Sequence, residues 1–162
     1  MKRLLIALML LASSAFAWDS ILLPDPALTP GDVLTQDARI VCVPGYAGSV
    51  RDVSQATKRK VFARYKILTR APYEYEIDHL VSLVLGGSNE ITNLWPQSYK
   101  STPVNALTKD RLEAKIRWLV CRGDLALDTA QYQIRTNWLK AYETHVGPLP
   151  TLEPSTGTPR IK

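Results

Sequence analysis

The amino terminus constrains this 162-residue chain most, because it indicates which residues fold and in which compartment. A short positive end, Met1 to Arg3, precedes an uncharged, largely apolar run of 14 residues, Leu4 to Ala17. This pattern is typical of a secretory signal peptide, and we expect cleavage before Trp18. A membrane anchor is the alternative, although the run is shorter than the roughly 20 residues that cross a bilayer. We therefore expect an exported protein, periplasmic or secreted, with no membrane attachment after processing.

Export changes the interpretation of the two cysteines, Cys42 and Cys121. In an oxidising compartment such a pair usually forms a disulfide bond. Two free buried thiols or two metal ligands are the alternatives, and the pair lacks the CxxC spacing typical of zinc sites. We predict a Cys42–Cys121 disulfide.

Proline-rich segments delimit the part of the chain that is expected to fold. Residues 18–37 hold several prolines without a sustained period, which predicts an extended lead-in that packs locally or not at all. Residues 148–162 combine Pro, Ser, Thr and Gly and are predicted to be a disordered tail without chemistry. The working domain is therefore expected at residues 38–147, enough for one core.

Hydrophobic periodicity predicts an α+β domain. Residues 38–43 suggest a short strand, and Ser54 is expected to cap a helix running to about Tyr65. Strand material at 73–85 is interrupted near His79, and a second apolar stretch at 91–95 is stopped by Pro96. Two helices are expected to follow.

The first of these helices is expected to open at Thr102-Pro103 and to end at Arg122-Gly123. The second is expected to begin with a capping-box-like pair, Asp128 and Gln131. Their predicted inner faces are Leu112, Ile116, Leu119 and Val120 in the first helix, and Ala130, Ile134, Trp138 and Ala141 in the second.

The charge of the chain is mildly positive. The formal net charge is +5, and removal of Lys2 and Arg3 with the leader would leave 5 − 2 = +3. This balance is compatible with a polyanionic partner but does not require one.

The two histidines, His79 and His145, have different settings. His145 lies at the polar end of the last predicted helix, where a charge near a helix C-terminus needs no further role. His79 directly follows Asp78 at the end of a strand-like run and precedes a Gly-rich turn. An Asp-His dipeptide alone favours a structural histidine, so the surrounding motif decides its interpretation.

That motif extends over most of the domain. The sequence reads YEIDHL at 75–80, LGGSN at 85–89, TNLWP at 92–96 and KDRLE at 109–113. Together these segments resemble the HNH endonucleases, a branch of the His-Me finger nucleases, and in particular small bacterial and phage members with a DH…LGGSN…NLWP…KDRLE pattern. The resemblance covers about residues 42–138. It implies a small ββα-metal core with flanking helices, which the predicted disulfide would staple.

The resemblance also implies roles for individual residues. His79 matches the general base, since an imidazole can deprotonate water near neutral pH. Asp78 matches a ligand of one divalent ion, Mg²⁺ or Mn²⁺, which prefers hard oxygen donors. Asn93, 14 residues beyond His79, matches the residue that holds the loop and so aims the histidine; it would be a turn residue in either case.

The sequence departs from the family in the helix that follows the second strand, where the usual histidine ligand is absent. Asn105 is the best replacement as a metal ligand, and an Asn without a role is the alternative. Lys109, one turn further on the same face, is expected to hold a phosphate. Further contacts along the phosphate path are expected from Arg70, Arg111 and Lys115.

The sequence thus predicts a metal-dependent endonuclease that hydrolyses DNA, with RNA as a second substrate, at low sequence specificity. No base-reading module is visible, and Trp95, which could stack on a base, is more typical of a core residue before Pro96. A catalytically inactive nucleic-acid-binding protein on the same fold is the main alternative, supported by the departure at Asn105. A purely structural or interaction domain is the third interpretation, and no protein partner is indicated.

Overall fold

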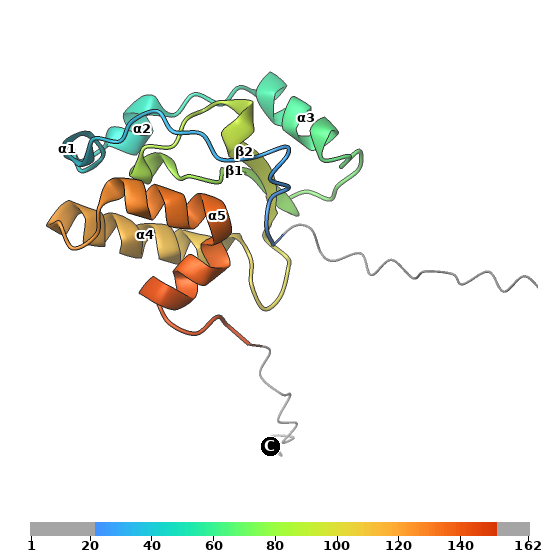
Figure 1. The fold of residues 1–162 in the computed structure, drawn as a ribbon. Helices are drawn as coiled ribbons and strands as arrows, with labels where there is room; N and C mark the ends of the chain where they lie inside the picture. The colour runs from blue at the N-terminus through green and yellow to red at the C-terminus, as the bar shows by residue number, and fades with distance from the viewer. Residues whose placement is uncertain (1–21, 152–162) are drawn as a thin grey trace, which may run out of the picture.

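The computed structural model describes residues 22–151 (Figure 1). It is an α+β fold, as predicted, with a two-stranded sheet and helices before and after it. The elements are α1 (Ala38–Val41), α2 (Tyr46–Val50), α3 (Gln55–Arg64), β1 (Tyr75–His79), the 3₁₀ turns η1 (Leu83–Leu85) and η2 (Ile91–Asn93), β2 (Leu94–Ser98), α4 (Ala106–Arg122) and α5 (Leu127–His145). The predicted signal peptide and most of the predicted tail lie outside the described residues, so export and processing stay predictions.

Strands β1 and β2 pair antiparallel and bring the Asp-His dipeptide to the end of the sheet. Asp78 lies opposite Trp95, and His79 lies opposite Leu94. Pro96, expected to stop the second strand, instead lies inside β2 opposite Ile77. A proline is tolerated there because each strand of a two-stranded sheet is an edge strand, which needs hydrogen bonds on one side only.

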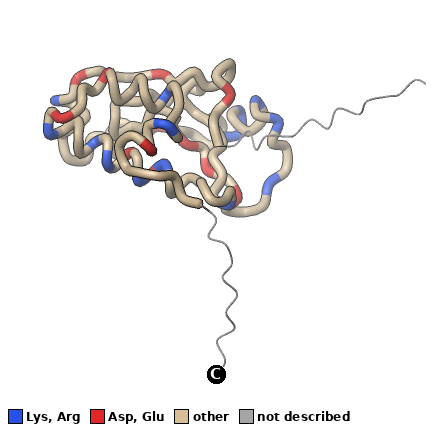
Figure 2. The backbone as a smooth tube through the Cα atoms, turned by 60° about the horizontal axis from the view of Figure 1, so that its bottom comes forward, with Lys and Arg blue, Asp and Glu red and all other residues tan. Residues whose placement is uncertain are grey.

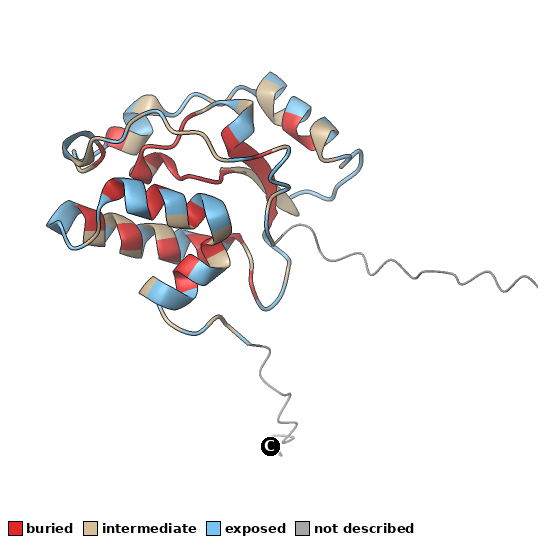
Figure 3. Cartoon of the chain, viewed as in Figure 1, coloured by how far each residue is buried: buried red, intermediate tan, exposed pale blue. Residues whose placement is uncertain are grey.

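Helices α4 and α5 lie side by side and pack against the loop that holds η1, whereas α3 packs against β2 (Figure 1). The predicted inner faces of α4 and α5 are buried apart from Leu119, which is half-buried, and together with Trp95 they form the core seen in Figure 3. Gly123, in the left-handed conformation, ends α4 as predicted. The predicted capping box of α5 is wrong: the cap is Ala126, and Asp128 accepts a hydrogen bond from the Thr129 backbone N–H instead.

Two expected element starts are also wrong. The run at 38–43 forms the single turn α1, because the Asp37 carboxylate accepts from the Arg39 N–H and caps a helix rather than a strand. Helix α4 starts at Ala106 rather than at Thr102, because Asn105 provides the cap. The start of α3 is confirmed, since Ser54 Oγ accepts from the Thr57 N–H at 3.0 Å.

The lead-in packs across the domain, so the expectation of local packing or none is wrong for its described part. Gly31 N–H donates to the Thr92 carbonyl, Val33 pairs with Gly87, and the Trp138 indole donates to the Leu22 carbonyl at 2.7 Å. An extended segment needs no period to bury scattered apolar residues, which is why the sequence pattern did not show these contacts.

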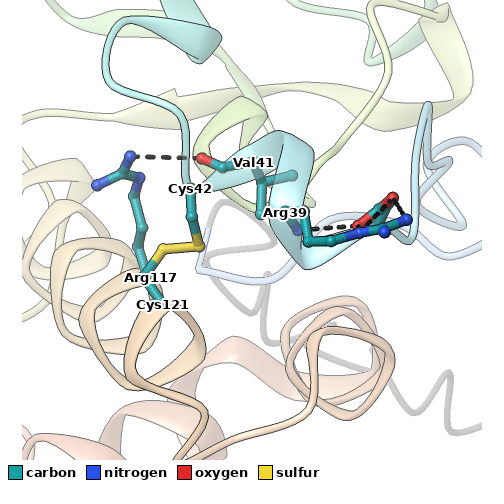
Figure 4. The surroundings of a disulfide bond; sticks show 6 residues. Arg39, Val41, Cys42, Arg117 and Cys121 are labelled. Carbon is teal, nitrogen blue, oxygen red and sulfur yellow. Dashed lines mark hydrogen bonds and ion pairs between the residues drawn. A yellow bond between two sulfur atoms is a disulfide. The ribbon is translucent and has the colours of Figure 1, made fainter.

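The Cys42–Cys121 disulfide is formed, as predicted, with 5.5 Å between the Cα atoms. It ties the end of α1 to the end of α4, and beside it Arg117 donates to the Val41 carbonyl at 3.3 Å (Figure 4). Within residues 22–151, no helix is both long and apolar enough to cross a membrane. Both findings are compatible with the expected export.

Removing the disulfide should destabilise the domain strongly. The bond joins residues 79 apart, and loop-closure entropy predicts roughly 4–5 kcal/mol as an upper guide. We expect Cys42→Ser, Cys121→Ser and the double variant to lose the same free energy of unfolding in urea titrations, because each removes one shared bond. Additive losses, or two reactive thiols in unfolded, unreduced wild-type protein, would contradict the bond.

Candidate active site

The imidazole of His79 is buried, with 2% of the residue exposed, and its Nε2 lies 3.1 Å from Asn89 Oδ1. Two backbone groups orient the Asn89 amide: its Nδ2 donates to the Val50 carbonyl at 2.6 Å, and its Oδ1 accepts from the Asp52 N–H at 3.2 Å. Asn89 Oδ1 is therefore an acceptor, so Nε2 must donate. The neutral ring carries its proton on Nε2 and keeps a lone pair on Nδ1.

Burial lowers the pKa of His79, and the charges of Arg51 and Lys109 act in the same direction. The hydrogen bond to Asn89 and the charge of Asp78 oppose this effect without cancelling it. A lowered pKa means that the neutral form predominates at neutral pH. The side chain is thus in the protonation state that a general base requires.

Asn93 holds the loop that follows His79. Its side chain is fully buried; Oδ1 accepts from the Val81 N–H at 2.9 Å, and Nδ2 donates to the carbonyls of Val81 and Ser88 at 2.9 and 2.8 Å. Both amide hydrogens and the oxygen are therefore used within the loop. These are loop-holding contacts of the kind expected for Asn93, whereas a part in catalysis stays a prediction.

The glycine pair lets this loop close. Gly86 adopts φ +79°, a left-handed conformation that favours glycine. A Cβ at Gly87 would overlap the Val81 carbonyl oxygen and lie 2.9 Å from Asn93 Nδ2. The loop therefore approaches its own start too closely for any side chain at Gly87.

The buried Lys109 forms an ion pair with the partly buried Asp78. Lys109 has no exposed surface, and its Nζ donates to Asp78 Oδ2 at 2.7 Å, to the His79 carbonyl at 2.8 Å and to Glu113 Oε1. The second Glu113 oxygen accepts from Ser82 Oγ at 2.7 Å. An ammonium has three N–H donors, and all three are used here.

The expected phosphate contact of Lys109 is therefore wrong in this arrangement, because the ammonium lies in the interior with no donor left. Burial alone would lower the pKa of Lys109, but the Asp78 and Glu113 carboxylates outweigh it and hold that pKa above its ordinary value. Burial raises the pKa of Glu113, and the charge of Lys109 limits the rise. Helical spacing places Lys109 on the inner stripe of α4, three residues before Leu112 and seven before Ile116, so the periodicity was the signal for its inward position.

Asn105, the expected metal ligand, caps α4. Its Oδ1 accepts from the Leu107 N–H at 3.1 Å, and Thr108 completes a capping box. Within the described part of the chain, no three His, Cys, Asp or Glu side chains are grouped so that they could hold a metal ion. With Asp78 bound to Lys109 and Asn105 used as a cap, the expected ligand pair does not fit a metal ion.

Of the other expected phosphate contacts, Arg111 and Lys115 lie one turn apart on α4, whereas Arg70 precedes β1; Figure 2 shows basic residues spread over several elements. Arg70 stacks on Phe62 at 3.8 Å, Lys115 stacks on Trp118 at 4.4 Å, and Arg111 is exposed on α4. Trp95 is fully buried, in agreement with the expected core position.

Sequence reasoning missed two residues of this site, Asn89 and Arg51. Asn89 was visible as the last residue of the LGGSN segment but was interpreted only as part of a turn. Arg51 is exposed, forms no ion pair within residues 22–151, and acts electrostatically on His79. Nothing in the local sequence marks Arg51, because only folding brings residues 50–52 to Asn89.

Comparisons with protein-family models, with curated proteins and with solved structures found no match to this chain.

Closing the loop through Gly87 should be a stability requirement of the site. We expect Gly87→Ala to lower the free energy of unfolding by about 1–3 kcal/mol, because the new methyl group would overlap the Val81 carbonyl oxygen and force the loop open. Gly48→Ala is the matched control: it lies in α2, and a Cβ there meets nothing within 4 Å. Equal stability of the two variants in thermal unfolding would contradict the close approach.

Proposed function

We propose that this chain is an endonuclease, a hydrolase of nucleic-acid phosphodiester bonds in which His79 is the general base. The observation that carries the proposal is the hydrogen bond between His79 Nε2 and Asn89 Oδ1. It assigns the proton to Nε2 and leaves Nδ1 able to accept one. An unprotonated ring nitrogen on a neutral imidazole is what a general base requires.

The order of elements supports the same proposal. Strand β1, a loop held by Asn93, strand β2 and helix α4 follow one another as in the ββα core that the sequence resemblance implies. His79 ends the first strand, where that resemblance expects the base. We keep DNA as the expected substrate, with RNA as the second.

The chemistry assigned to this chain is a proton transfer beside a phosphate. His79 Nδ1 takes a proton from water while the water oxygen forms a bond to phosphorus, and the bond from phosphorus to the leaving sugar oxygen breaks. The proton stays on the imidazolium, and solvent protonates the leaving oxygen. Arg51 is the nearby exposed cation that would neutralise the phosphate oxygens. Such a contact does not read bases, which is consistent with low specificity.

No step in this scheme is assigned to a metal ion, because Asp78 and Asn105 are committed to Lys109 and to the α4 backbone. The same pairing favours the second candidate, a nucleic-acid-binding protein without turnover. In that case Asp78 and Lys109 would only stabilise the fold. The two candidates differ in whether His79 supports cleavage.

His79→Ala should abolish most cleavage of supercoiled plasmid while the fold survives. We expect a loss of about 10²- to 10⁴-fold, the usual contribution of a positioned base. His145→Ala is the matched control and should retain the wild-type rate, since its ring contacts Gln133 on α5. Assays with Mg²⁺ and with EDTA should both be run, and the proposal is judged by dependence on His79 in either condition.

The pH dependence of the rate follows from the direction of the His79 shift. Because its pKa is lowered, the rate should rise with pH through a midpoint below about 6.5 and stay level above it. The proposal would be ruled out if the His79→Ala variant cleaved plasmid at the wild-type rate. It would also be ruled out if the wild-type chain cleaved no nucleic acid in any condition. DNA binding without cleavage in a gel-shift assay would then identify the second candidate.

A further inference from the structure

We propose that the ammonium of Lys109 is the resident cation of this site and occupies the place in which Asp78 would otherwise ligate a divalent metal ion. The proposal concerns the site assigned above to hydrolysis. It is tested without nucleic acid, so the two proposals can fail separately.

The acceptors around Lys109 Nζ are the ligands that a hard divalent ion prefers. They are two carboxylates, from Asp78 and Glu113, and one backbone carbonyl, from His79. Carboxylate and carbonyl oxygens also bind Mg²⁺, Mn²⁺ and Ca²⁺ in proteins. The structure thus has an oxygen-lined cation position with an ammonium in it.

A metal ion and this ammonium cannot share the position. Mg²⁺ would need to lie about 2.1 Å from a ligating oxygen, whereas Nζ already lies 2.7 Å from Asp78 Oδ2 and 2.8 Å from the His79 carbonyl. A metal ion and the ammonium that contacted the same oxygens would be close neighbours, and two positive charges that close repel each other strongly in a buried site. One of them must leave for the other to bind.

Lys109 is anchored so that it does not leave readily. It is fully buried on α4, and Glu113, one turn further on the same helix, holds its ammonium from a second side. Glu113 is in turn held by Ser82 of the loop after β1. Moving the ammonium out would leave two partly buried carboxylates, Asp78 and Glu113, without a counter-charge.

The ammonium also differs from a metal ion in solution because it is covalently part of the chain and is always present at the site. Its three donors meet three acceptors from β1 and α4, so the cation links strand to helix within one chain. An imported ion would do the same only at a sufficient concentration. The expected consequence is a site whose charge balance does not depend on divalent ions.

The test is Mn²⁺ binding followed by electron paramagnetic resonance of the free ion. We expect wild-type protein and Asp78→Asn to leave the same amount of Mn²⁺ free, because in both the Lys109 ammonium occupies the cation position. Lys109→Ala should take up one additional Mn²⁺ per chain, and Lys109→Ala combined with Asp78→Asn should lose it again. Lys115→Ala, on the same helix but outside the cluster, is the matched control and should gain no ion.

Uptake of one Mn²⁺ by wild-type protein that is lost in folded Asp78→Asn would overturn the proposal, as would a folded Lys109→Ala chain that gains none. Should Lys109→Ala fail to fold, the comparison of wild type with Asp78→Asn still decides. A second measurement uses wild-type protein alone: the ¹⁵N resonance of the Lys109 ammonium should remain unchanged in millimolar MgCl₂. Displacement of that resonance by Mg²⁺ would equally overturn the proposal.

Discussion

The buried ammonium of Lys109 joins the end of β1 to α4, and the position of the candidate base depends on it. Through its bonds to Asp78 and to the His79 carbonyl, it fixes the backbone on one side of the imidazole. Asn93 fixes the other side, since its backbone carbonyl accepts from the Leu80 N–H and its side chain binds Val81. The peptide that carries His79 is thus held at both ends.

The side chain of His79 is held separately, by Asn89 from the far end of the same loop. The Asn89 amide is oriented by the backbone of residues 50–52, so the segment after α2 is coupled to the imidazole. This coupling also places the charge of Arg51 near His79. Loop closure at Gly87, the Asn89 contact and the Arg51 charge therefore belong to one arrangement around a single ring.

The sequence predicted those features that depend on local pattern or on simple chemistry. Gly123 ends α4, the inner face of α5 is buried as its period indicated, and the two cysteines form a disulfide in the structure. The apolar run at 38–43 was ambiguous because a short stretch of this kind suits a strand or a single helical turn, and the Asp37 cap decided it.

The candidate site was predictable only in part. The DH and LGGSN segments pointed to His79 and its loop, but the partners of each side chain depend on tertiary contacts. Lys109 has the helical spacing of the buried stripe that holds Leu112 and Ile116, and its charge can be buried there because two carboxylates, which the sequence does not reveal as its partners, compensate the cost. Arg51 is distant in sequence from the motif and becomes part of the site only when the chain folds.

The tautomer of His79 tests most directly the central claim that the fold maintains a neutral histidine with a free Nδ1. Long-range ¹H–¹⁵N correlation spectra of the imidazole distinguish the two ring nitrogens, and a His145→Gln variant assigns the signals. We expect a neutral ring at neutral pH, with the proton on Nε2 and none on Nδ1. A proton on Nδ1 of the neutral ring, or an imidazolium at neutral pH, would contradict the claim.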